Sequence, residues 1–338
     1  MASDMVLKRT TTLLSLLIVG ALIAGCGSEE PEIDFGDGGA SAAQIAAARS
    51  TAQTNSSCTS LGNFYWEIGN VNSILVSGQV GSGAISRTTV HEVASASKWM
   101  FGAYVFQIKN GAPTSLDKKF LRMLAGYTSL TNTSCSDSSN GGDSVGACQS
   151  FGTNGGYDSG SDGVFAYDGG HYQKWAVENG MSQLTKSSLA TQYRTVLGTE
   201  LPITFARPQL AGGVSTSAAG YAQFLRKLIS KQLSLGNNLG KEPVCTVPGA
   251  AGCTAAESPI TAGLHYSYGH WIEDDSTGDG AFSSPGAFGF YPWIDATKKF
   301  YGVISRKDNS ADDGIGSGEA SMVCGRKIRA AFKSGVAQ

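Results

Sequence analysis

The sequence has few charged residues and few histidines for its length. Of its 338 residues 15% are Asp, Glu, Lys or Arg, the formal net charge is −2, and there are four histidines. It has no run of basic residues and no aromatic residues interleaved with basic ones, so a nucleic-acid partner is not expected. The histidines show no ligand spacing and no C-x-x-C pair occurs, so neither a metal site nor a cofactor is expected.

A hydrophobic run near the start of the chain is short. The apolar segment Leu13–Ala24 follows Lys8 and Arg9 and is too short to span a bilayer comfortably. A short apolar run after positive charges is typical of the core of a signal peptide. Residues 1–25 are therefore expected to be a targeting segment and not part of the fold.

The end of that segment, Ile23–Cys26, resembles the bacterial lipobox, in which the cysteine is lipidated and becomes the mature N-terminus. An ordinary signal peptide with a chance cysteine is the alternative. Residues 26–43 are rich in Gly, Glu, Asp and Ser and are expected to form a flexible tether. We therefore expect an exported lipoprotein of the bacterial envelope, bound to the membrane through Cys26, on the periplasmic side or at the cell surface.

Without Cys26, six cysteines remain. An even number in an exported chain indicates three disulfides. Short separations favour Cys135–Cys148 and Cys245–Cys253, which leaves Cys58–Cys324, although six cysteines allow other pairings. The last pair would join the start of the domain to its end.

Strand-like segments are concentrated at the two ends of the remaining domain, residues 44–338. They are Asn63–Gly69, Ser73–Val80, Tyr266–Glu273, Ala287–Ile294 and Phe300–Arg306. Helical patterns occur at Ser41–Gln53, Val93–Ile108, Leu116–Leu124, His171–Asn179, Ala218–Leu233 and Glu319–Phe332. We expect a sheet subdomain from residues 44–94 and 264–338, and a helical subdomain from residues 95–263 inserted between its two parts.

The segment Val93–Ile108 predicts a helix that is apolar almost all round, which is typical of a helix buried on every side. At a spacing of three, Ser95 and Lys98 share one face of that helix. A lysine inside an apolar helix is costly unless it is paired or loses its proton, and a neutral lysine is a base. This arrangement can activate a serine as a nucleophile.

Ser-x-x-Lys is a weak motif by itself, because the chain holds a second copy, Ser115–Lys118. The second copy follows Pro113 and opens an amphipathic helix. A serine that caps this helix is therefore the favoured interpretation there.

Three further stretches strengthen the case for Ser95. They are Phe165–Tyr172, Ala211–Phe224 and Ser284–Gly289. Together with Ser95 and Lys98, in this order and spacing, they resemble the serine hydrolases of the β-lactamase and penicillin-binding protein superfamily. The closest resemblance is to the branch of class C β-lactamases, D-alanyl-D-alanine carboxypeptidases and esterases, over residues 60–332. It implies an α/β (α+β) fold, with an antiparallel sheet formed by both termini, flanking helices and an inserted helical domain.

The resemblance also implies residue roles. Ser95 would be the nucleophile, Lys98 its proton acceptor or electrostatic partner, and Tyr167 a second general base and acid. The backbone N–H groups of Ser95 and Ala287 would bind the oxyanion.

The substrate-binding positions that the resemblance implies are Gly169, Ser284 and Gly286, and two of them depart from the family pattern. The family motif Tyr-x-Asn is Tyr167-Asp168-Gly169 here, so the amide is missing. The strand motif, usually Lys-Thr-Gly or His-x-Gly, is Ser284-Pro285-Gly286, so the lysine that helps to hold a substrate carboxylate is missing. Both losses favour an ester or amide of less anionic character over a β-lactam or a D-Ala-D-Ala peptide.

Tyr266, Tyr268 and Trp271 are expected in the core of the sheet, and a role at the rim of the site stays open for one of them.

Two classes of function remain in competition. The first is an exported serine hydrolase that acts through an acyl-Ser95 intermediate on a small ester or amide, with a β-lactamase or carboxypeptidase as the alternative. The second is a non-catalytic envelope-binding lipoprotein with the same fold, suggested by the missing asparagine and lysine. The retention of Ser95, Lys98 and Tyr167 favours the hydrolase.

Overall fold

The computed structural model describes residues 39–83, 85–131, 135, 139, 142–308 and 316–338. The expected signal peptide, Cys26 and the tether up to residue 38 lie outside these residues. The first helix, α1, begins at Ala42, inside the expected tether, because Ser41 and Gln44 form a capping box at its start. Among the described residues, no helix is both long and apolar enough to span a bilayer.

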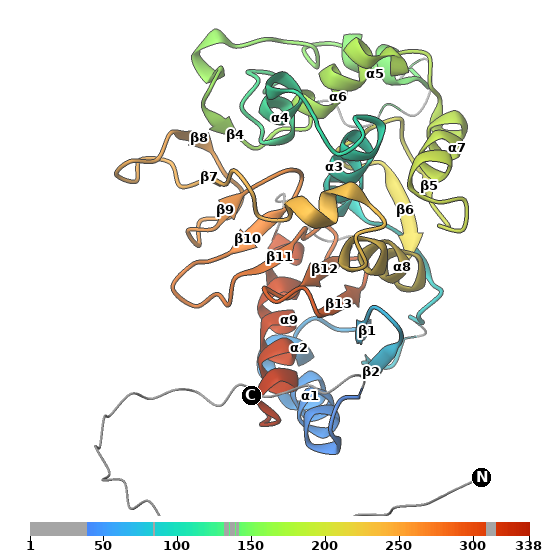
Figure 1. Cartoon of the computed structure of the whole chain (residues 1–338), viewed down its shortest axis with the longest axis vertical. Helices are drawn as coiled ribbons and strands as arrows, with labels where there is room; N and C mark the ends of the chain where they lie inside the picture. The colour runs from blue at the N-terminus through green and yellow to red at the C-terminus, as the bar shows by residue number, and fades with distance from the viewer. Residues whose placement is uncertain (1–38, 84, 132–134, 136–138, 140–141, 309–315) are drawn as a thin grey trace, which may run out of the picture. The chain divides into compact units, whose positions relative to one another are not determined.

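An antiparallel sheet of eight strands forms the centre of the domain (Figure 1). In spatial order its strands are β2 (Ile74–Val80), β1 (Phe64–Asn70), β13 (Phe300–Ser305), β12 (Tyr291–Ile294), β11 (Ala281–Ser283), β10 (Trp271–Glu273), β9 (His265–Tyr266) and β7 (Val244–Cys245). Strand β1 pairs with β13 over the whole length of β13, so the two ends of the domain share one sheet, as expected.

Helices cover both faces of this sheet. Phe300 of β13 packs on Phe332 of α9 (Gly316–Ser334), whereas the next residue, Tyr301, accepts a hydrogen bond from Arg226 of α8 (Ala218–Ile229). Successive strand residues point to opposite faces, so α8 and α9 lie on opposite sides of the sheet. Helices α1 (Ala42–Thr54) and α2 (Ser56–Thr59) pack against α9 (Figure 1).

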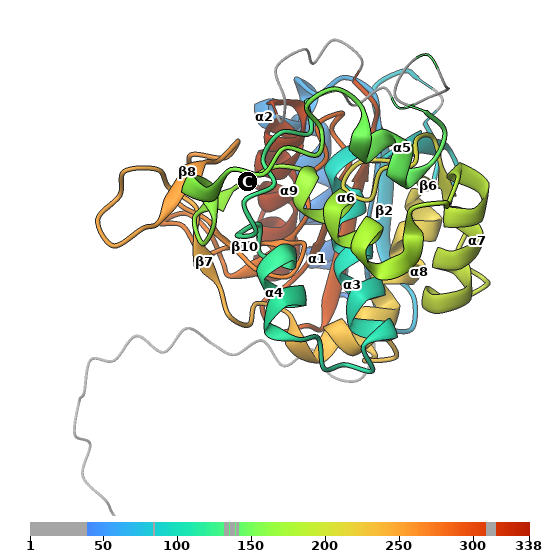
Figure 2. The same cartoon turned by 90° about the horizontal axis from the view of Figure 1, so that it is seen from above.

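The helical part of the domain is built around α3 (Ser97–Ile108). The other α-helices here are α4 (Ser115–Leu121), α5 (Val145–Ser150), α6 (Gly170–Ala176) and α7 (Lys186–Leu197). Short helical turns are η1 (Ala94–Ala96), η2 (Ser159–Ser161), η3 (Val177–Met181) and η4 (Ser234–Asn238). Two small sheets add β3 (Val90–Glu92), β6 (Val214–Ser217) and β5 (Thr204–Phe205), and β4 (Phe165–Ala166) with β8 (Ala255–Glu257). Figure 2 shows these elements from above.

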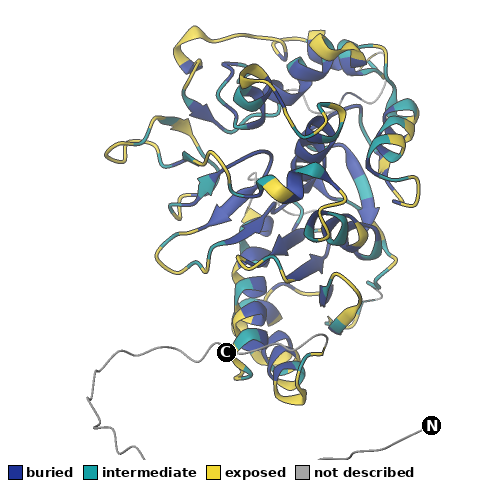
Figure 3. Ribbon diagram, viewed as in Figure 1, coloured by how far each residue is buried: buried dark blue, intermediate teal, exposed yellow. Residues whose placement is uncertain are grey.

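Helix α3 is buried on every side, as its uniformly apolar sequence predicts. Each residue from Ser97 to Phe106 is buried, and most of the helix is dark blue in Figure 3; Gln107 and Ile108 at its end are less buried. Aromatic rings from other elements surround it, among them Tyr172 and Trp175 of α6 on Phe101. A polar side chain on this helix therefore has little access to water.

Two expected strands are interrupted. The segment Tyr266–Glu273 is split into β9 and β10 by a turn at Gly269, which has a φ of +84° and lies so close to α3 that a Cβ atom there would be 2.3 Å from the carbonyl oxygen of Lys98. The strand expected at Ala287–Ile294 begins only at Tyr291. The residues before it form a turn, in which the N–H of Gly286 donates to the carbonyl of Phe290 and the N–H of Gly289 donates to the carbonyl of Gly286.

The six cysteines in the described residues form three disulfides. They are Cys58–Cys324, Cys135–Cys148 and Cys245–Cys253, the pairs favoured by the sequence spacing. Cys58–Cys324 joins α2 to α9, and therefore ties the start of the domain to its end.

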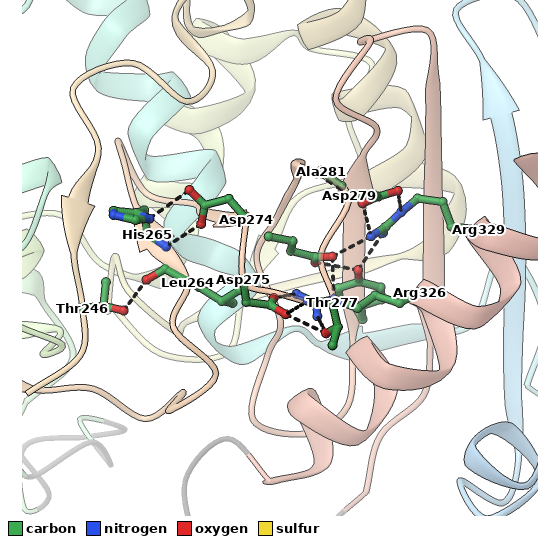
Figure 4. Close-up of polar contacts among 12 residues, drawn as sticks. Thr246, Leu264, His265, Asp274, Asp275, Thr277, Asp279, Ala281, Arg326 and Arg329 are labelled. Carbon is green, nitrogen blue, oxygen red and sulfur yellow. Dashed lines mark hydrogen bonds and ion pairs between the residues drawn. The ribbon is translucent and has the colours of Figure 1, made fainter. Parts of the chain in front are cut away.

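A network of ion pairs fixes the β10–β11 hairpin to α9. Arg329 lies 2.6 Å from Glu273 and 2.7 Å from Asp279, and Arg326 lies 2.6 Å from Asp275 (Figure 4). Glu273 and Arg329 are almost completely buried, so the loss of either partner would leave an uncompensated charge in the core. The network gives this hairpin, which begins at Trp271, a fixed position against the sheet.

Candidate active site

Ser95 lies in the helical turn η1, directly before α3. Its side chain is only partly buried, whereas Ala94, Ala96 and Ser97 beside it are buried. Ala94 has a φ of +45°, a left-handed conformation that is unfavourable for a residue with a Cβ atom. Such strain is held in place by surrounding contacts and is concentrated at functional sites.

Lys98 points at Ser95 from one turn further along. Its Nζ lies 2.9 Å from Ser95 Oγ and donates a hydrogen bond to the carbonyl oxygen of Ala211 at 3.1 Å. The lysine is 5% exposed. The amine and the hydroxyl that the sequence places on one helical face are therefore in direct contact.

Burial lowers the pKa of Lys98 to about 7, because a charged ammonium is poorly solvated there; the carboxyl of Asp168 opposes this shift in part. Burial in turn raises the pKa of Asp168 above its usual range, although its carboxyl accepts hydrogen bonds from the N–H groups of Gly170 and Leu130, at 2.6 and 3.2 Å. At neutral pH a substantial fraction of Lys98 is uncharged and able to accept a proton.

Tyr167 follows β4 and reaches the same place. The Lys98 Nζ lies 4.6 Å from the centre of its ring. Burial raises the pKa of Tyr167 to about 12, and contacts of its hydroxyl with Ser95 and with the indole of Trp271 limit that rise. The structure thus brings Tyr167 to Ser95 and Lys98, although Tyr167 lies far from both in the sequence.

Two neighbouring strands hold Tyr167. The N–H of Tyr167 donates to the carbonyl of Glu257 at 3.1 Å, and that of Phe165 donates to Thr254 at 3.0 Å, so β4 is paired with β8. The disulfide Cys245–Cys253 closes the loop that leads into β8 from β7, the edge strand of the large sheet. The position of Tyr167 therefore depends on this loop.

The segment from Ala211 to Val214 packs along the start of α3. Besides the contact of Ala211 with Lys98, the N–H of Val214 donates to Ser97 Oγ at 3.1 Å, and its carbonyl accepts from the N–H of Val93 at 3.0 Å. The glycine-rich motif of the sequence thus forms one wall of the site. Its backbone, not its side chains, makes these contacts.

The segment Ser284–Ala287 forms another wall. The hydroxyl of Ser284 donates to the carbonyl of Ser95 at 3.1 Å, and a Cβ atom at position 286 would lie 2.1 Å from the carbonyl oxygen of Val93. Glycine is therefore required at position 286, because the backbone of Val93 leaves no room for a side chain there. Ser284 supports the segment that carries Ser95, and its contact with substrate stays a prediction.

The backbone N–H groups of Ser95 and Ala287 donate to no backbone acceptor among the described residues. Both residues are partly exposed, and the contacts of Ser284 and Gly286 hold their two segments against each other. Unused N–H groups at such a place can bind a developing oxyanion. Their expected role is thus compatible with the arrangement.

The structure supplies a reason for glycine where the family motif has asparagine. A Cβ atom at position 169 would lie 2.8 Å from Leu130 Cδ2 and 3.0 Å from the Cβ of Ala211. A longer side chain would have to displace both residues. The site therefore has apolar groups beside position 169, where the resemblance leads one to expect an amide.

The second Ser-x-x-Lys copy lies elsewhere in the domain. Ser115 is exposed at the start of α4, and Lys118 forms an ion pair with Glu242. Thr114, not Ser115, is the residue that caps the helix, since its side chain accepts a hydrogen bond from the N–H of Asp117. The expected cap is thus wrong by one residue, and this copy has no contact with the site.

Two residues near the site were not assigned there from the sequence. Asp168 acts on Lys98, and its place in the motif directly after Tyr167 is a signal that could have identified it. Trp271 stacks on Tyr167, with the ring centres 5.3 Å apart. Sequence reasoning left a role at the rim open for it but could not distinguish it from Tyr266 or Tyr268.

Comparisons with known proteins place the fold. No protein-family model matches the sequence, and no curated protein does. Solved structures match over most of the chain. EstCE1, a hydrolase with promiscuous acyltransferase activity, has a TM-score of 0.60 at 11% identity, over 86% of this chain and 98% of that one.

Two further structures show the same similarity. The D-stereospecific amidohydrolase from Streptomyces sp. has a TM-score of 0.58 at 11% identity, over 88% of this chain and 99% of that one. The penicillin-binding protein from Bacillus halodurans has a TM-score of 0.52 at 11% identity, over 80% and 95%. These likenesses confirm the expected fold: a mixed α/β domain with a large antiparallel sheet and an inserted helical part.

Proposed function

We propose that this chain, which has the β-lactamase/transpeptidase-like fold, is an exported serine hydrolase that forms an acyl-Ser95 intermediate. The observation that carries the proposal is the buried Lys98 amine, 2.9 Å from the Ser95 hydroxyl and with its pKa lowered to about 7. A buried lysine that served only the fold would gain nothing from contact with a partly exposed serine. The solved neighbours described as hydrolase and amidohydrolase support the same chemistry.

The pKa values assign the two proton carriers. Lys98, with a pKa of about 7, accepts the proton of Ser95 as Oγ bonds to the acyl carbon. The carbonyl electron pair moves onto oxygen, where the N–H groups of Ser95 and Ala287 stabilise the charge. Tyr167, with a pKa of about 12, is protonated at neutral pH, so it is the donor.

Collapse of the tetrahedral intermediate breaks the bond to the leaving group. The bonding electron pair stays on the leaving atom, which takes the proton of Tyr167, and the ammonium of Lys98 returns a proton to the tyrosine oxygen. Water then repeats the sequence on the acyl-Ser95 ester and releases the acid. Each proton taken from a nucleophile is thus returned to a leaving group.

An ester or amide of modest negative charge is the substrate class we favour. The strand lysine that would hold a carboxylate is replaced by Ser284, whose hydroxyl is used on the Ser95 carbonyl. Leu130 and Ala211 surround position 169, so no side-chain amide is offered there. A β-lactamase or D-Ala-D-Ala carboxypeptidase is the second candidate, supported by the likeness to a penicillin-binding protein.

Export through the signal peptide and lipid attachment at Cys26 belong to the same proposal. The three disulfides support it, because disulfides persist in oxidising compartments outside the cytosol. Metabolic labelling of the expressed chain with a palmitate analogue tests it. Label on the wild type and none on Cys26→Ala supports a lipoprotein, whereas export with no label on the wild type supports an ordinary signal peptide.

The activity is tested by treating the purified exported protein with a fluorophosphonate and locating the adduct by mass spectrometry. Label on Ser95 that is lost in Ser95→Ala supports the serine mechanism. A panel of short-chain esters, amides, nitrocefin and D-Ala-D-Ala peptides then ranks the substrate classes. A folded protein with no label at Ser95 and no turnover would favour the non-catalytic binding protein.

A further inference from the structure

Trp271 begins strand β10 and closes the site behind Tyr167. Its side chain is 1% exposed. Its ring stacks on Tyr167, with centres 5.3 Å apart and planes 29° apart, and meets Tyr266 edge-on at 5.0 Å. Strand β10, which carries the indole, is fixed by its pairing with β9 and by the ion pairs of the β10–β11 hairpin with α9, some of which Figure 4 shows.

Two buried polar groups at this contact lack a well-formed hydrogen bond. Among the described residues, neither the indole Nε1 of Trp271 nor the hydroxyl of Tyr167 has a partner with regular geometry. Buried polar groups are normally paired, so an adjacent pair of unsatisfied groups needs an explanation. The indole N–H is nonetheless close enough to lower the pKa of Tyr167, as the Ser95 hydroxyl does.

An unpaired indole N–H means little by itself. Trp99, in the same core, also has a buried Nε1 without a partner among the described residues, and it stacks on His270 at 5.5 Å. The two tryptophans differ in the side chain on which each ring stacks. Trp271 lies against a phenol that carries a proton in the proposed reaction, whereas Trp99 lies against a fully buried histidine.

We propose that Trp271 is a positioning residue for the reaction: its indole N–H holds the Tyr167 oxygen after that oxygen has given its proton to the leaving group. The inference rests on the proposed function. A neutral phenol gains little from this donor, but a phenolate-like oxygen gains a charge-assisted hydrogen bond, which is about twice as strong as a neutral one. The interaction therefore acts mainly in the transition state of leaving-group departure, where it increases the rate.

The leaving group provides the test. A p-nitrophenyl ester departs without a proton, whereas a methyl ester of the same acid needs the proton of Tyr167. Trp271→Phe removes the N–H, and we expect kcat/KM for the methyl ester to fall about 10- to 100-fold, as for loss of a hydrogen bond to a charged group. The loss for the p-nitrophenyl ester should be much smaller. Trp99→Phe, the matched deletion of a buried indole, should change both esters by the same factor.

Equal losses for the two esters in Trp271→Phe would overturn the inference, because a purely structural role affects both. The inference would also be overturned if Trp99→Phe lowered kcat/KM for the methyl ester more than for the p-nitrophenyl ester, as Trp271→Phe is expected to do. Since phenylalanine leaves space in the core, the second variant carries benzothienylalanine at position 271, which keeps the fused ring and lacks only the N–H. This variant should lose activity on the methyl ester but little on the p-nitrophenyl ester. If the ratio of the two kcat/KM values stays as in the wild type, the N–H has no such role.

A double variant separates positioning of Tyr167 from other effects. In a Tyr167→Phe background, Trp271→Phe should cause no further selective loss. A further loss of full size would mean that Trp271 acts independently of Tyr167, against the inference. Fluorophosphonate labelling of wild-type Ser95 distinguishes failure of this inference from failure of the proposed function. If Ser95 takes no label, the hydrolase itself is rejected. If Ser95 is labelled but the Trp271 variants keep the wild-type ratio of kcat/KM for the two esters, only the role of Trp271 is rejected.

Discussion

The two Ser-x-x-Lys segments of this chain have the same spacing and opposite environments. Ser95 and Lys98 lie at the start of a helix buried on all sides, and the amine contacts the serine hydroxyl, a backbone carbonyl and an aromatic ring. Ser115 is exposed at the start of a short helix, and Lys118 pairs with Glu242 near the surface.

The difference shows that burial, not spacing, changes the chemistry of the lysine. An ammonium paired with a carboxylate near water contributes little stability. The same group inside α3 is poorly solvated, which lowers the pKa of Lys98 to about 7. Lys98 can therefore act as a base at neutral pH. Matched substitutions in the two segments test this conclusion.

Replacement of the serines should give the largest contrast. Ser95→Ala removes the proposed nucleophile, and we expect ester turnover to fall by about 10⁴- to 10⁶-fold, the range found when a nucleophile is deleted. Ser115→Ala should leave kcat/KM unchanged. The measurement is steady-state hydrolysis of a short-chain ester, with thermal melting to verify folding. Equal ester turnover by Ser95→Ala and the wild type would show that Ser95 is not the nucleophile.

Replacement of the lysines should give the next largest contrast. Lys98→Met removes the base and places an apolar side chain in an apolar site, so folding should be kept while kcat falls about 10²- to 10⁴-fold, the usual contribution of a general base. Lys118→Met should lose about 1 kcal/mol of stability or less and no activity. Comparable losses of kcat in both variants would show that the environment does not distinguish the two lysines.

The pH dependence sharpens the comparison. Because Lys98 must lose its proton to act, kcat/KM should rise with pH through an apparent pKa of about 7. The Asp168 carboxylate favours the charged lysine, so in Asp168→Asn the rise of kcat/KM should occur at lower pH than in the wild type. The measurement is a pH–rate profile between pH 5 and 9. If the rise of kcat/KM in Asp168→Asn occurred at higher pH than in the wild type, Lys98 would not be the group that must lose its proton.

The smallest expected effect concerns the structural role of the second segment. The Thr114 hydroxyl accepts from the N–H of Asp117 and caps α4. Thr114→Ala should therefore cost about 1 kcal/mol in the free energy of unfolding, with kcat/KM unchanged. Urea denaturation and ester turnover on the same sample measure both quantities. A loss of activity without a loss of stability would show that this region takes part in the reaction.

Much of the fold and the central residues of the site follow from local patterns. The uniformly apolar sequence around Ser95 predicts a buried helix, and the resemblance to the serine hydrolase superfamily implies that Tyr167 lies near it. The spacing of the cysteines favours the three disulfides that the structure contains. In each of these cases the information lies within a few residues or in a motif of known arrangement.

The remaining features depend on contacts between distant segments. A turn from Gly286 to Phe290 replaces the start of the strand expected at Ala287–Ile294, and the carbonyl of Val93 leaves no room for a side chain at position 286. Likewise, Leu130 and Ala211 restrict position 169 to glycine. The effect of Asp168 on Lys98 requires both to be desolvated in one place. No local pattern in the sequence contains these distances.

The joining of the two ends of the domain has a practical consequence. The N–H of Gln338 donates to Thr51 at 2.9 Å, and Asn55 donates to the carbonyl of Gln338 at 3.0 Å, so the C-terminus rests on α1, beside α9. The segment that carries Ser95 lies on the other side of the sheet, where the hydroxyl of Tyr221 in α8 donates to the carbonyl of Ala96. A bead or reporter fused after Gln338 would therefore sit behind the sheet and leave the approach of substrate to Ser95 unobstructed.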